Sequence, residues 1–178
     1  MTTLIGAVPL SDSTEILFYL DTYKNKRYAK MRKFVKTNTY TGPTKSGLNL
    51  TPDNLKIIYE SLKNISTEIT NLEESELCRI LISKFKGIFI FVRIAYYNGN
   101  YGIDIREYFE IQNEMQPTKK GVRIPFEYLS DTRSHLENML KKISDPNIDK
   151  INFNDSESNS SMSIKEIEGV PSEYASFF

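Results

Sequence analysis

Lysine, arginine and tyrosine residues recur at a constant spacing in the two halves of this 178-residue sequence. The pairs, each 74 positions apart, include Tyr23 and Tyr97, Arg32 and Arg106, Pro43 and Pro117, Thr44 and Thr118, Lys45 and Lys119, and Gly47 and Gly121. Aromatic rings that stack on bases, with cations that follow phosphates, hold single-stranded nucleic acid without reading its sequence. For any one ring, core packing is an equal alternative, and for any one lysine a solvated turn is more common than a contact with a ligand. The joint recurrence predicts a duplicated nucleic-acid-binding unit.

Residues suited to catalysis form no such pattern. His135 is isolated on a predicted helix, and Cys78 lies in an apolar stretch that we expect to be helical, without a histidine nearby. Asp104 and Glu107 are three positions apart on a predicted strand, which places them on opposite faces. We therefore expect a protein that is not an enzyme, with no catalytic residue, metal site or cofactor.

The charge of the chain is divided unevenly along its length. Residues 1–144 contain 21 basic and 16 acidic side chains, whereas residues 145–178 contain 2 basic and 7 acidic ones. A basic body suits a polyanionic partner, and a separate acidic segment either avoids that surface or competes for it.

The sequence also predicts where the protein acts. No apolar stretch approaches the roughly 20 residues of a membrane span, and the N-terminus lacks the basic and apolar pattern of a secretion signal. A single cysteine, Cys78, argues against a disulfide framework. We expect an intracellular protein without membrane contact, located in the cytoplasm or nucleoid of a bacterial or phage-infected cell, or in the nucleus or a viral replication site of a eukaryotic host.

The repeated residues are expected to lie on strands and turns. Aromatic and β-branched runs separated by turn-like residues predict one hairpin in each half. The expected strands are 16–23, 28–35 and 48–50 in the first half, and 88–97, 101–111 and 122–124 in the second. A helix follows each third strand, because Leu55, Ile58 and Leu62, and later Leu129, Leu136 and Ile143, recur at helical spacing.

These elements predict an α+β fold with two tandem repeats and a tail. We assign 1–70 to the first repeat, 71–84 to a helical connector, 85–144 to the second repeat and 145–178 to an acidic tail. Units of this size bury little surface alone, so the repeats are expected to pack together through their helices as an intramolecular pseudo-dimer.

A family resemblance rests on two segments of the second half. The segment 101–109 reads YGIDIREYF and 114–121 reads EMQPTKKG. Together they resemble the transcriptional positive-cofactor-four family, whose core reads roughly IDIREYW, then EMKPGRKGISL, then a helix. The resemblance covers about 60 residues of the second repeat. The first repeat keeps only a Tyr-Lys-Asn-Lys turn, Arg32 and the Pro-Thr-Lys-x-Gly turn.

The resemblance implies a curved, four-stranded antiparallel sheet followed by a helix, with two such units presenting grooves to single-stranded DNA. Pur repeats and plant Whirly proteins are similar in plan. By this resemblance the stacking positions are Tyr23, Tyr97 and Phe109, and the positions that contact the backbone or lie beside it are Lys24, Lys26, Arg32, Lys45, Arg106, Lys119 and Lys120. The family's stacking Trp is Phe109 in the second repeat and Val35 in the first, which predicts a weaker first groove.

The tail is expected to dock on a partner through Tyr174, Phe177 and Phe178, which close an acidic segment. Such tails are similar to those of bacterial and phage single-strand-binding proteins. The expected function is largely sequence-independent binding of single-stranded DNA in replication, recombination or repair, with a transcriptional coactivator on melted promoter DNA, an RNA-binding protein and a protein-binding adaptor as alternatives. The protein is expected to be a monomeric pseudo-dimer or a homodimer.

Overall fold

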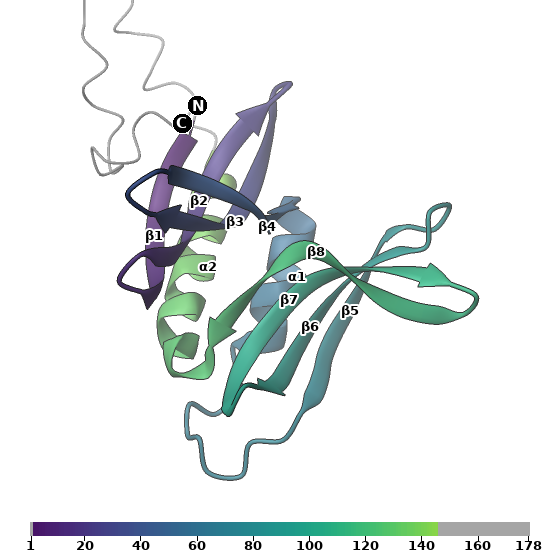
Figure 1. The fold of residues 1–178 in the computed structure, drawn as a ribbon. Coiled ribbons are helices and arrows are strands. Elements are labelled where there is room, and N and C mark those ends of the chain that lie inside the picture. Colours follow the sequence, from purple (N-terminus) through teal and green to yellow (C-terminus); the bar gives the residue numbers. More distant parts are fainter. Residues whose placement is uncertain (1, 146–178) are drawn as a thin grey trace, which may run out of the picture.

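A computed structural model describes residues 2–145, which form two four-stranded antiparallel sheets and two helices that pack on them (Figure 1). The first sheet contains β1 (Thr2–Ser11), β2 (Thr14–Tyr23), β3 (Lys26–Lys36) and β4 (Thr41–Leu50), and the second contains β5 (Ser75–Ser83), β6 (Ile88–Tyr97), β7 (Asn100–Ile111) and β8 (Glu114–Pro125). Each sheet keeps its strands in sequence order. The α+β fold with two repeated sheets is confirmed. The predicted docking residues Tyr174, Phe177 and Phe178 lie outside the described residues.

The constant spacing between the repeats holds in three dimensions. The β2 and β6 strands begin and end 74 residues apart, and both lead into two-residue turns. Backbone φ is positive at Lys24 and Asn25 in the first turn, and at Asn98 and Gly99 in the second. Turns with two positive φ angles match the twist of a hairpin and favour asparagine and glycine. The two predicted hairpins are therefore the centres of the two sheets.

Each sheet leads into a helical segment at the predicted place. The first helix, α1 (Pro52–Leu62), has Thr51 as its N-cap, and the Thr51 hydroxyl accepts a hydrogen bond from the Asn54 amide at 3.3 Å. In the second repeat a short 3-10 segment, η1 (Phe126–Tyr128), precedes α2 (Leu129–Ile143). A threonine cap with proline in the first turn is a common helix start.

The helices join the two repeats into one core. The α2 helix packs on β1, β2 and β3 of the first sheet, while α1 packs on β5 of the second sheet and on β3 and β4 of its own (Figure 1). The two helices also contact each other. Leu62 and Leu136, which occupy equivalent positions, are both fully buried in one shared apolar cluster. The predicted association through the helices is confirmed, with each repeat completing the core of the other.

The prediction of a helical connector at 71–84 is wrong. Residues Ser75–Ser83 form β5, the edge strand of the second sheet, which pairs with β6. The register shifts next to Leu77 and Ile82 interrupt the alternation that would have indicated a strand. The β5–β6 connection spans 84–87, whereas the β1–β2 connection spans only 12–13. The first strand of each repeat therefore falls outside the constant spacing, and the second repeat begins about ten residues earlier than predicted.

None of the helices in the described part of the chain is long and apolar enough to span a membrane.

Candidate nucleic-acid interface

The second sheet has one face turned away from the helices, which we call the outer face. Its side chains follow from the strand register, since residues paired across antiparallel strands share a face. One row contains Arg93, Asp104 and Arg123, the next contains Arg79, Phe91 and Arg106, and the next contains Leu81, Phe89 and Tyr108. The neighbouring positions Ile103 and Ile105 point to the opposite face and are fully buried in the shared core. The outer face therefore combines rings with arginines.

The rings of the outer face lie against one another. Phe91 and Tyr108 stack with a centroid distance of 4.4 Å and an interplanar angle of 18°, and Phe89 meets Phe91 edge-on at 6.4 Å. The Arg79 guanidinium lies 4.3 Å from the Phe91 centroid. Offset stacking and cation–π contact with arginine are the two interactions through which nucleobases also bind protein rings. Phe91 is only 4% exposed and Tyr108 only 8%. Arg79 also donates two hydrogen bonds of 3.1 Å to the Glu76 carboxylate, so a base would reach Phe91 only by displacing Arg79.

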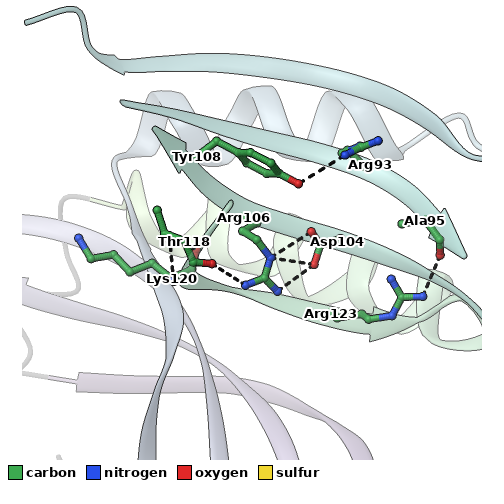
Figure 2. A network of polar contacts seen from close by, with 8 residues as sticks. All are labelled: Arg93, Ala95, Asp104, Arg106, Tyr108, Thr118, Lys120 and Arg123. Carbon is green, nitrogen blue, oxygen red and sulfur yellow. Dashed lines mark hydrogen bonds and ion pairs between the residues drawn. The ribbon is translucent and has the colours of Figure 1, made fainter. Parts of the chain in front are cut away.

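Arg93 adds a cation next to this stack (Figure 2). Its Nη1 lies 3.4 Å from the Tyr108 hydroxyl, and its buried Nε has no hydrogen-bond partner within residues 2–145. The hydrogen bond to Tyr108 raises the pKa of Arg93 although burial opposes it, so the guanidinium is charged at any physiological pH. A buried donor without an acceptor is costly. A phosphate oxygen is the kind of acceptor that would satisfy it.

Arg106 is held on three sides by the protein itself (Figure 2). Its Nη2 and Nε donate to the Asp104 carboxylate at 3.0 to 3.3 Å, and its Nη1 donates to the Thr118 carbonyl at 3.0 Å. With these donors engaged, Arg106 is a positioning residue that shapes the β7–β8 edge. It contributes charge to the outer face more than free hydrogen-bond donors.

The contact with the threonine carbonyl recurs in the first repeat, where Lys30 replaces Asp104. Arg32 Nη1 donates to the Thr44 carbonyl at 3.1 Å, just as Arg106 does to Thr118. Opposite Arg32 is Gly47, where an added Cβ would lie 2.7 Å from the Met31 carbonyl oxygen, too close for any side chain. The register of each sheet shifts at this point. The repeated Arg and Pro-Thr-Lys-x-Gly residues thus maintain a β-bulge, a structural reason for their recurrence.

The remaining predicted residues lie at turns and edges. Tyr97 is 65% exposed and Tyr23 is 61% exposed, each at the start of a hairpin turn. The Arg123 guanidinium lies 5.8 Å from the Tyr97 ring centroid, and the Lys24 ammonium lies 5.4 Å from the Tyr23 centroid. The predicted lysines Lys24, Lys26, Lys45, Lys119 and Lys120 are all exposed. Tyr97 continues the outer face of the second sheet, and Lys119 and Lys120 lie at its β8 edge.

The expectation that Phe109 shares a face with Arg106 and Tyr97 is wrong. The β6–β7 register is regular along the whole of β7, so residues three apart on that strand point to opposite faces. Phe109 pairs with Ile88 and lies on the face of Ile105, not on the outer face. Tyr108, one position earlier, is the aromatic residue that lies on the outer face beside Arg106.

Six aromatic and arginine residues of the outer face were not among the predicted site residues. They are Arg79, Phe89, Phe91, Arg93, Tyr108 and Arg123. The signal was present in part, because Tyr108 lies two positions after Arg106 on a predicted strand and must share its face. The others depend on cross-strand register, and Arg79 lies on a strand that was predicted as helix.

The outer face of the first sheet has a different composition. Leu17, Tyr19 and Phe34 are buried in a small apolar cluster that is separate from the shared core, and Leu4 packs against it. Lys30 forms an ion pair with Asp21 at the edge of this cluster. Burial raises the pKa of the Tyr19 hydroxyl, despite the opposing charges of Arg32 and Lys30.

The contacts of His135 and Cys78 indicate that both residues have structural roles. The His135 ring packs 5.0 Å from the Phe18 ring, and its Nε2 lies 3.3 Å from the Ala7 carbonyl oxygen, so it joins α2 to the first sheet. Burial raises the pKa of the Cys78 thiol, which disfavours the reactive thiolate. Within residues 2–145, no group of three or more His, Cys, Asp or Glu residues could hold a metal ion.

The second repeat matches a known protein family. Residues 89–134, which span β6 to β8 and the start of α2, match the family model of the Transcriptional Coactivator p15 (PC4). The family resemblance stated from the sequence is therefore confirmed over the second repeat. No curated protein sequence matches the chain.

Two solved structures align with most of this chain at low similarity. The crystal structure of WHY3 from Arabidopsis thaliana aligns with a TM-score of 0.39 at 6% identity, over 78% of this chain and 86% of that one. The structure of the plant transcriptional regulator PBF-2 aligns with a TM-score of 0.42 at 6% identity, over 89% of this chain and 91% of that one.

Proposed function

We propose that this protein is a non-enzymatic single-stranded DNA-binding protein, and that the outer face of the second sheet is its main binding surface. One observation carries the proposal: the stacked rings and arginines of that face lie mostly in the segment 89–134, which matches the coactivator family model. The protein acts inside the cell, where its nucleic-acid partner is.

The proposed binding combines stacking with charge neutralisation. Bases stack on Phe91, Tyr108 and Tyr97, while the arginines and the edge residues Lys119 and Lys120 neutralise phosphates. Every base has a π-face and every nucleotide a phosphate, so binding is largely independent of sequence. Binding releases the salt cations that were condensed on the strand, and this release becomes less favourable as the salt concentration rises. Affinity should therefore fall steadily with salt.

A titration with labelled oligonucleotides tests the proposal. Full-length protein is titrated with single-stranded DNA, single-stranded RNA and duplex DNA at several salt concentrations. We expect the single strands to bind more tightly than the duplex, with an affinity that decreases with salt. Absence of binding to any oligonucleotide at low salt would overturn the proposal and favour the adaptor function. Tighter binding to RNA than to DNA would make RNA the natural ligand.

The acidic segment 145–178 is proposed to recruit replication, recombination or repair proteins through Tyr174, Phe177 and Phe178. A tethered polyanion has a high effective concentration and also competes with nucleic acid for a basic surface. Deleting 164–178 should tighten single-strand binding at low salt, change it little at high salt, and abolish recruitment. Unchanged affinity at low salt with unchanged recruitment would leave the segment with neither role.

A transcriptional role is the second candidate, and the name of the matched family favours it. In that case the ligand is the melted strand of a promoter. The two roles predict different partners for the tail, replication enzymes or transcription proteins. Crosslinking of the full chain on a DNA bubble in the presence of each class of partner separates them. Sedimentation of the same sample decides between a monomeric pseudo-dimer and a homodimer.

A further inference from the structure

A pocket of about 470 Å³ lies where the β6–β7 turn meets the first repeat. Its walls include Tyr97, Tyr101, Arg123 and Glu127 from the second repeat, and Leu10 and Ile69 from the first. Pockets of this size, mostly apolar with a few polar groups, are typical of sites for small ring systems. The pocket exists only because the two repeats pack together.

Arg123 connects this pocket with the outer face of the second sheet. Its backbone pairs with Asp104 in the row that also contains Arg93, while its side chain lines the pocket. The guanidinium is held in place, because Nη2 donates to the Ala95 carbonyl at 2.8 Å (Figure 2). The same nitrogen donates to the Asn100 carbonyl at 3.0 Å. Arg123 therefore belongs both to the row of Arg93 on the outer face and to the wall of the pocket.

The first repeat has a hollow at the equivalent place, but there an arginine side chain caps the end of a helix. That hollow is lined by Arg27 and Ile143. Arg27 is the equivalent of Tyr101, and Ile143 is the equivalent of Ile69, each pair being 74 residues apart. Arg27 Nη1 donates to the Ile143 carbonyl at 3.2 Å and to the Lys142 carbonyl at 3.5 Å. Cationic donors at the last carbonyls of a helix stabilise its C-terminus. In the second repeat Tyr101 replaces this arginine, and an aromatic wall replaces the helix cap.

We infer that the pocket lined by Tyr97, which we call the Tyr97 pocket, holds one unstacked nucleobase of the strand that crosses the outer face. The inference rests on the proposed function. The exposed Tyr97 ring supplies the stacking surface, with the Arg123 guanidinium beside it. Glu127 also lines the pocket, and a carboxylate there would accept a hydrogen bond from an exocyclic amino group, which adenine, cytosine and guanine carry and thymine lacks. The pocket would therefore disfavour thymine, relative to cytosine for example, at one position of an otherwise sequence-tolerant strand.

An abasic scan tests the inference. A series of oligonucleotides, each with one abasic site at a different position, is titrated against full-length wild type and Tyr97→Ala. With wild type, an abasic site at one position should lower the affinity about tenfold, the usual effect of losing one stacked base. With Tyr97→Ala that penalty should disappear, and Tyr97→Phe should restore it. Tyr23→Ala, the equivalent exposed tyrosine of the first repeat, is the matched control and should keep the penalty.

A base substitution at the sensitive position tests the role of Glu127. Wild type should bind cytosine there several-fold more tightly than thymine, and Glu127→Gln should reduce this difference. An equal abasic penalty in wild type and Tyr97→Ala would overturn the inference while the proposed function stands. Absence of any single-strand binding by wild type would instead overturn the proposed function itself.

Discussion

The outer faces of the two sheets differ although the sheets share one plan. Where the second sheet stacks Phe91 on Tyr108, the first places Leu17 and Phe34 at the equivalent positions. Phe89, Arg79 and Arg123 correspond to Glu15, Ala7 and Asn49. The second sheet therefore has more rings and more cations, and the first has a small apolar cluster.

On the proposed function, this difference makes the second sheet the main binding surface. Both repeats retain the arginine, threonine and glycine that maintain the β-bulge, because the geometry of each sheet depends on them. The first sheet keeps Tyr19 and Phe34 beside Lys30 and Arg32, whereas the second has three rings and four arginines in the corresponding rows. The first repeat contributes to the Tyr97 pocket and to the shared core.

The largest effect is expected from the shared core. Leu62→Ala and Leu136→Ala each remove a fully buried side chain at equivalent positions of the two helices. Each should lower the free energy of unfolding by about 2 to 5 kcal/mol. Since each helix completes the core of the other repeat, thermal unfolding should keep a single transition in both variants. Two separate transitions would show that the repeats fold independently.

The next effect concerns the stacked pair of the outer face. Phe91→Leu gives the second sheet the residue found at the equivalent position of the first, Leu17. Loss of this ring should weaken single-strand binding by about 1 to 3 kcal/mol, measured by fluorescence titration. Phe109→Leu is the control, because Phe109 lies on the opposite face of the same sheet. Weaker binding by the Phe109 variant alone would restore the sequence-based assignment.

A smaller effect is expected at the edge of the second sheet. Replacing Lys119 and Lys120 with Ala should make the salt dependence shallower, by about 0.7 for each phosphate that is no longer neutralised, in a plot of log affinity against log salt. The exposed Lys120 ammonium also lies 3.4 Å from the carboxylate of the largely buried Glu107. Lys45→Ala, in the first repeat, should leave the slope unchanged. An equal effect of Lys45→Ala would show that both sheets contact the strand.

The smallest effect is a pH dependence confined to the first sheet. Burial alone would raise the pKa of Asp21, but hydrogen bonds from Lys30 and Thr2 outweigh it and lower that pKa. The carboxyl of the folded protein binds a proton less readily than that of the unfolded chain. The ionised carboxylate therefore stabilises the fold above the unfolded pKa of about 3.8, and this stabilisation decreases as the pH falls through the folded pKa.

Asp21→Ala, which introduces the residue found at the equivalent Ala95, tests this dependence. The variant should reduce acid-side pH dependence by less than about 1 kcal/mol, measured by denaturant unfolding between pH 2 and about 6. An unchanged pH profile would show that the pair with Lys30 contributes nothing to stability.

Much of the fold could be predicted from the sequence because the relevant signals are local. The two-residue hairpin turns depend on Asn25, Asn98 and Gly99, which tolerate positive φ. The N-cap at Thr51 and the helical spacing of Leu129, Leu136 and Ile143 are also local patterns. Duplication repeated the turn and helix signals, although the Thr51 cap has no counterpart before α2. The PC4 family match is confined to the second repeat.

The face of each side chain and the partner of each helix were decided by the tertiary structure. Because strands alternate with a period of two, a shift of one position moves a ring to the other face, which separates Tyr108 from Phe109. The β5 strand is specified by its pairing with β6, since two register shifts obscure its own alternation. The packing of each helix on the sheet of the other repeat depends on contacts between residues far apart in the sequence. The Tyr97 pocket depends on them too, since Leu10, Ile69 and Tyr97 all line it. No local pattern encodes such contacts, because they form only when both repeats bury their apolar faces against each other.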